Sequence, residues 1–160
     1  MAFNLERNKG KVDEIKQNIE AKKSELAKLE ENKEKLMDAG SDIQGSEIDE
    51  EVQETIMEQI NRALEENAEK GTELSGEMDS DARQLDELKQ ETSESISSND
   101  EQKSKLEQKK ALLDRFGLGG SLEDAISELD DNKQDLEEFN EELIETEKEM
   151  HEVSHKLSSL

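Results

Sequence analysis

The sequence predicts an all-α protein built from long antiparallel coiled-coil helices. Of its 160 residues, 41% are charged and only 29% are apolar, which is too little apolar surface for a thick globular core. Proline is absent, so no residue forcibly interrupts a helix. Apolar residues also recur at spacings of three and four, the pattern of helices that each bury one narrow stripe.

The first helix is predicted over about residues 3–38. A seven-residue repeat places ten residues at its two seam positions, and seven of the ten are apolar. They are Leu5, Val12, Ile19, Leu26 and Lys33 at one position, and Asn8, Ile15, Lys22, Leu29 and Leu36 at the other. The glycines of segment 38–46 then predict the end of this helix, and Ser46 with the acidic residues after it predicts the start of the next.

The middle helix is predicted over about residues 47–115, with a less regular seam. Two segments are weak enough to bend or break it. Segment 71–80 contains two glycines, and segment 95–100 contains serines followed by a possible capping pair, Ser98 and Glu101. The other interpretation of segment 95–100 is a polar stretch on one continuous helix.

The last helix is predicted over about residues 121–158. Leucine or methionine recurs every seven residues from Leu122 to Leu157, so a partner helix is required. Before this helix, the glycine-rich segment 116–120 predicts a stop, and Ser121 is the expected cap.

Helix length favours an elongated three-helix arrangement within one helical domain, residues 1–160. At roughly 1.5 Å per residue, the outer helices reach about 50 to 57 Å each, and an unbroken middle helix reaches about 100 Å. Both outer helices then fit against the middle one. The alternative is a four-helix bundle with a break near 95–100.

The strong negative charge limits the classes of partner. The formal net charge of −24 disfavours contact with nucleic acids and anionic membranes. No apolar run is long enough for a signal peptide or a membrane span, so we expect a protein that is cytoplasmic or is exported without a cleaved signal. A chain of carboxylates also allows a third function, in which the protein imitates DNA and inhibits a nucleic-acid-binding protein.

No motif predicts catalysis, a cofactor or a metal site. His151, His155 and Glu147 share spacing suited to a metal, but the neighbouring seam turns them toward water. The glycines of segment 117–120 lack the lysine of a phosphate-binding loop. The chain therefore has no expected catalytic, cofactor-binding or metal-binding residues.

Candidate interaction residues are apolar residues near the two predicted turns. They are Ile43, Ile56, Phe116 and Leu118. Basic residues between 103 and 115 are either a docking stripe or the solvated flank of a coiled coil.

The chain resembles the helical-hairpin proteins of bacterial type VII secretion, the WXG-type and LXG-type substrates and their small helical partners. The literal match is Leu118-Gly119-Gly120 in a glycine-bearing turn, and the family's tryptophan and tyrosine motifs are absent. This resemblance implies a non-catalytic protein–protein interaction module, either a targeting domain or a partner of a secreted bacterial toxin. A structural coiled coil that pairs with a second copy is the alternative.

Overall fold

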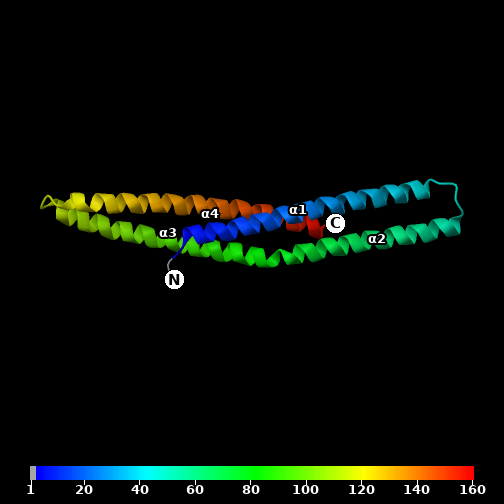
Figure 1. Cartoon of the computed structure of the whole chain (residues 1–160), viewed down its shortest axis with the longest axis horizontal. Coiled ribbons are helices and arrows are strands. Elements are labelled where there is room, and N and C mark those ends of the chain that lie inside the picture. Colours follow the sequence, from blue (N-terminus) through cyan, green and yellow to red (C-terminus); the bar gives the residue numbers. More distant parts are fainter. Residues whose placement is uncertain (1–2) are drawn as a thin grey trace. The chain divides into compact units, whose positions relative to one another are not determined.

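The computed structural model describes residues 3–160, and within that range it contains helices and no strand. The α-helices are α1 (Leu5–Gln44), α2 (Glu50–Glu77), α3 (Asp79–Asp114) and α4 (Glu123–Ser158). A short 3₁₀-helix, η1 (Gly119–Leu122), precedes α4. Figure 1 shows these elements along the chain. The predicted all-α fold of long antiparallel helices is confirmed.

The chain divides into two compact units, whereas the sequence predicts one domain over residues 1–160. The α3–α4 unit contains the described residues 3–13 together with Arg83–Glu147. The α1–α2 unit contains Glu14–Ala82 together with Lys148–Leu160. The physical reason is that α1 and α4 each contribute one part of their length to either set of contacts.

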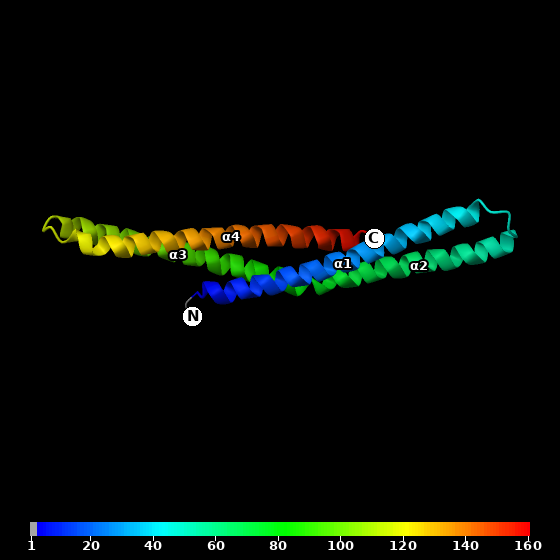
Figure 2. The same cartoon turned by 45° about the horizontal axis from the view of Figure 1, so that its top comes forward.

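In the α3–α4 unit, the two long helices are antiparallel neighbours, side by side in both views of Figures 1 and 2. Lys103 of α3 pairs with Asp130 of α4 at 2.6 Å, and Lys133 pairs with Asp100 at 2.8 Å. The hydrogen bonds that the two lysines donate to these carboxylates raise the pKa of both lysines. The buried core includes Val12, Leu85, Leu88, Leu136, Phe139 and Leu143.

The start of the described chain adds a third helical segment to this unit. The Phe3 ring lies 6.3 Å from the Phe139 ring in an edge-to-face arrangement, which is favourable for two aromatic quadrupoles. Val12 from the same segment is completely buried. A narrow apolar stripe is therefore sufficient for a core where three helices meet.

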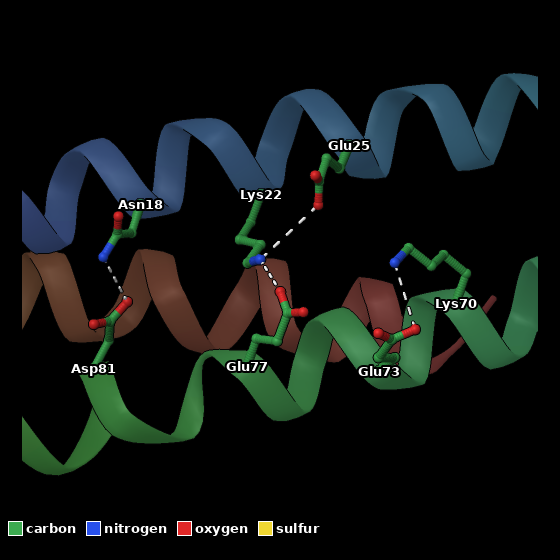
Figure 3. A network of polar contacts seen from close by, with 7 residues as sticks. All are labelled: Asn18, Lys22, Glu25, Lys70, Glu73, Glu77 and Asp81. Atoms are coloured by element: carbon green, nitrogen blue, oxygen red, sulfur yellow. Dashed lines mark hydrogen bonds and ion pairs between the residues drawn. The ribbon is translucent and has the colours of Figure 1, made fainter.

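In the α1–α2 unit, α1 and α2 are antiparallel, and the end of α4 packs against both of them. Its core includes Ile15, Ile19, Leu26, Leu74, Met150, Val153 and Leu157. Figure 3 shows polar contacts that flank this core: Lys22 of α1 reaches Glu77 of α2, and Asn18 reaches Asp81 at 3.4 Å. The hydrogen bond from Lys22 lowers the pKa of Glu77.

One residue, Met78, separates α2 from α3. Its backbone keeps near-helical angles (φ −82°, ψ −8°), its N–H donates to Ser75 and Gly76, and its side chain is buried. The interruption falls inside segment 71–80, which the sequence marks as weak. By contrast, α3 passes through residues 95–100 without a break, so the four-helix alternative with a break there is contradicted.

Packing explains why segment 95–100 stays helical. Asn99 is buried, and its side-chain amide donates to the Leu129 carbonyl of α4 at 2.7 Å. Thr92, two turns earlier, is also buried and donates to the Leu88 carbonyl within α3. Contacts with the neighbouring helix thus override the weak helical propensity of a serine-rich segment. Ser98 consequently lies inside α3 and does not begin a helix.

The helix boundaries at both turns differ from the predicted caps. Helix α1 continues to Gln44, and α2 begins at Glu50 with Asp49 as its N-cap, whose carboxylate accepts from the Glu51 N–H. Ser46 instead donates to the Ile43 carbonyl. Ser121 lies in η1 and donates to the Leu118 carbonyl, so it does not cap α4.

Candidate interaction site

The turn between α3 and α4 holds apolar side chains in solvent, and we call residues 109–123 the α3–α4 tip. At Gly117 the backbone enters the left-handed region with φ +72°, which favours glycine. The Gly117 N–H donates to Asp114, and the Leu118 N–H donates to Leu113. These two bonds form the Schellman motif that ends a helix, so α3 ends in a defined conformation.

The side chains of this tip are unusually exposed for apolar residues. Phe116 is 77% exposed, Leu118 is 60% exposed and Leu112 is 58% exposed. Phe116 is one of only three aromatic residues in the chain. Because a folded chain with so few aromatic residues normally uses them in its core, an exposed phenylalanine beside two exposed leucines marks a surface suited to another molecule.

Charge at this tip differs from charge elsewhere in the chain. Lys110 lies between two carboxylates, 3.7 Å from Asp114 and 3.4 Å from Glu123. Lys109 and Arg115 have no carboxylate partner within residues 3–160. The tip therefore presents two available cations next to its apolar side chains, in a chain of net charge −24.

Most of the basic stripe predicted between residues 103 and 115 is used within the unit itself. Lys103 pairs with Asp130, Lys105 pairs with Glu101 at 2.9 Å, and Lys110 pairs as described. These three lysines fit the description of a solvated coiled-coil flank. The two remaining cations, Lys109 and Arg115, are the part of the stripe that is available for docking.

The turn between α1 and α2 has different chemistry, and we call residues 37–56 the α1–α2 tip. It contains seven acidic residues and no basic residue. Three apolar side chains are exposed there: Met37 at 55%, Val52 at 49% and Ile48 at 39%. None of its carboxylates forms an ion pair with a described residue.

The four residues predicted from sequence divide between these two tips. Phe116 and Leu118 are exposed at the α3–α4 tip, and Ile43 and Ile56 are half-buried at the α1–α2 tip. Leu112 lies in the basic segment 103–115 that the sequence offers as a docking stripe, whereas Met37, Ile48 and Val52 were missed. The position of each residue in the seven-residue repeat carries this information. Leu113 lies on the buried seam, so the adjacent Leu112 must point away from it. Val52 also lies off the seam and is therefore exposed.

The described residues contain no group of three or more histidine, aspartate and glutamate side chains placed to hold a metal ion. A groove of about 470 Å³ lies beside Phe3 in the α3–α4 unit, and its lining includes Ser95, Asn99 and Leu129. It offers hydroxyl, amide and aliphatic groups. Among residues 3–160, no helix is long and apolar enough to cross a membrane.

Comparison with known proteins gives no further guide. Neither a family model, nor a curated protein, nor a solved structure matches this chain. The case for function therefore depends on the geometry and the charge of the two tips.

Proposed function

We propose that this chain is a non-catalytic protein–protein interaction module whose binding surface is the α3–α4 tip. The observation that carries the proposal is the 77% exposure of Phe116 at a turn fixed by two backbone hydrogen bonds. A fixed turn loses little conformational entropy when a partner binds, so the apolar contact is not offset by ordering of the loop.

The composition of the tip supports binding to a protein. Aromatic residues and arginine dominate the binding energy of many protein interfaces, and here Phe116 directly follows Arg115. Leu112 and Leu118 add apolar area near them. The matching partner surface is an apolar pocket with acidic residues at its rim, because Lys109 and Arg115 have no carboxylate partner within residues 3–160.

Site-specific photo-crosslinking tests this proposal in cells. We expect a photoreactive phenylalanine analogue at position 116 to form a discrete crosslinked product with a protein. The matched control is the same analogue at Ile144, which is 51% exposed but lies outside both tips. The Leu118→Ser variant should weaken the crosslink at position 116. Equal crosslinking at both positions, or none at position 116, would contradict the proposal.

A more specific form of the proposal is that the module targets a toxin, or itself, to a type VII secretion machine. The support is the resemblance of a helical hairpin with a glycine-bearing turn, here with Gly117 and Gly119. Export of the tagged chain by cells with the machine, compared with cells lacking it, tests this form. Equal amounts outside both kinds of cell would exclude targeting and leave the binding proposal intact.

A further inference from the structure

We infer that the protein that binds the α3–α4 tip is a second copy of this chain, which receives it on its α1–α2 tip. This inference rests on the proposed function, because it names the partner of the same surface. Two independent properties of the tips carry it: the location of the exposed apolar side chains and the opposite sign of the available charges.

Exposed apolar side chains are concentrated at the two tips. Seven large apolar residues are exposed in the described chain, and six of them belong to the tips. The α3–α4 tip contributes Leu112, Phe116 and Leu118, and the α1–α2 tip contributes Met37, Ile48 and Val52. Burial of these side chains against one another removes apolar area from water on both copies.

The available charges at the tips are opposite in sign. The α3–α4 tip has three basic and two acidic residues, and both acidic residues already face Lys110. The α1–α2 tip has seven acidic residues and no basic residue. Lys109 and Arg115 of one copy can thus pair with carboxylates of the other at an interface whose centre is apolar.

Charge also favours this contact between unlike tips over the two possible contacts between identical tips. Two α1–α2 tips facing each other would bring fourteen carboxylates together with no cation, twice the seven of each tip. Two α3–α4 tips would place Lys109 and Arg115 against the same residues of the second copy. Like charges opposed across an interface are unfavourable, so the unlike pair of tips is preferred.

A contact between two different surfaces of the same chain leaves one surface of each kind unused. A head-to-tail pair can therefore add further copies, and its growth continues unless the geometry closes a ring. We expect assemblies whose average mass rises with protein concentration.

Sedimentation velocity of the purified full chain tests the inference. The cation-deficient variant is Lys109→Glu with Arg115→Glu, and the acid-deficient variant is Glu47→Lys with Glu54→Lys. Each variant alone should lose association, with the apparent affinity lower by at least about tenfold. The control variant, Lys70→Glu with Lys105→Glu, changes the net charge as the first does but lies outside both tips, and it should associate as the unmodified chain does.

Mixing provides the decisive measurement. Each variant retains the tip that the other lacks, so an equal mixture should regain association. Circular dichroism on each variant verifies that its helices are intact. A chain that stays monomeric at all concentrations, a closed dimer unaffected by either variant, or a mixture that remains monomeric would overturn the inference. Retention of the crosslink at position 116 to a different protein would then leave the proposed function standing.

Discussion

At the scale of single residues, buried asparagines fix how neighbouring helices align. Asn67 of α2 donates to the Leu29 carbonyl of α1 at 3.0 Å and accepts from Asn32 at 3.0 Å. Asn99 makes the equivalent bond to Leu129 in the other unit. A shift of either pair along the helix axes would leave a buried amide without a partner, which is unfavourable. A polar seam residue thus specifies alignment at some cost in stability.

Gly71 is required by a close approach between helices. A Cβ at this position would overlap the Leu157 backbone carbonyl of α4, whereas a Cβ at Gly76, in the same helix, would meet nothing within 4 Å. The sequence marks segment 71–80 as weak because of its two glycines. The structure shows that one of the two instead permits tight packing.

We therefore predict opposite effects of alanine at these two glycines. Gly76→Ala should raise the free energy of unfolding by up to about 1 kcal/mol, because alanine favours the helix. Gly71→Ala should lower it by about 1 to 3 kcal/mol, because backbone atoms must move apart. Urea denaturation followed by circular dichroism measures both. Stabilisation by Gly71→Ala would show that α4 does not pack against this position.

At the scale of elements, the repeat pattern predicts which helices exist better than where they end. Leu136, Leu143, Met150 and Leu157 recur every seven residues, and all four are buried in α4. The end of α1 is six residues later than predicted, because Gly40 stays helical and buried near Met57. Such glycines stop a helix in isolation, but here packing against α2 outweighs the local preference.

The end of α4 should contribute strongly to stability despite its position near the last described residue. Leu157 is completely buried, so Leu157→Ala should lower the free energy of unfolding by about 2 to 5 kcal/mol. Leu112→Ala is the matched control, because Leu112 is 58% exposed and should change stability by less than about 0.5 kcal/mol. Equal effects in chemical denaturation would mean that α4 is not docked through Leu157.

At the scale of the whole molecule, charge should govern how stability responds to the solution. The net charge of −24 destabilises a folded chain through self-repulsion. We predict that the melting temperature rises when salt is added at neutral pH, because screening of this repulsion outweighs the loss of exposed ion pairs. A fall in melting temperature would show that the ion pairs dominate.

Between about pH 7.5 and about pH 5.5 the melting temperature should change little, because the ion pairs with shifted pKa values keep their full contribution throughout this window. Lys35 lowers the pKa of Glu31 and Lys22 lowers that of Glu77, so these contributions are complete above pH 4.5 and are lost only as the pH falls through the lower folded values.

The stabilisation by the lysines of these ion pairs is also unchanged between pH 5.5 and 7.5. Glu149 raises the pKa of Lys23, and Glu147 raises that of Lys89, so their stabilisation is complete below pH 10.5 and is lost as the pH rises through the raised values. Thermal melts followed by circular dichroism at several pH values measure the melting temperature and test this prediction. A melting temperature that changes markedly between pH 7.5 and 5.5 would contradict it.

The fold class and two of the three exposed apolar residues of the α3–α4 tip follow from sequence, and the remaining features do not. Phe116 and Leu118 could be chosen because they are apolar residues in the predicted turn. The two units could not be predicted, because periodicity shows that a helix needs a partner without showing which partner each part takes. The opposite available charges of the two tips could not be predicted either. They depend on the contacts of Lys110 with both neighbouring carboxylates, which the sequence does not show.

The division of the chain also determines when each unit can be completed during synthesis. The α1–α2 unit draws on Glu14–Ala82 and on Lys148–Leu160, and its Lys33 amine donates to the Leu160 carbonyl, 127 positions along the chain. Most of this unit leaves the ribosome early, yet Lys148–Leu160 follow only after all of Arg83–Glu147 has been made. The nascent α1–α2 hairpin must therefore wait with an uncovered apolar groove until Lys148–Leu160 emerge.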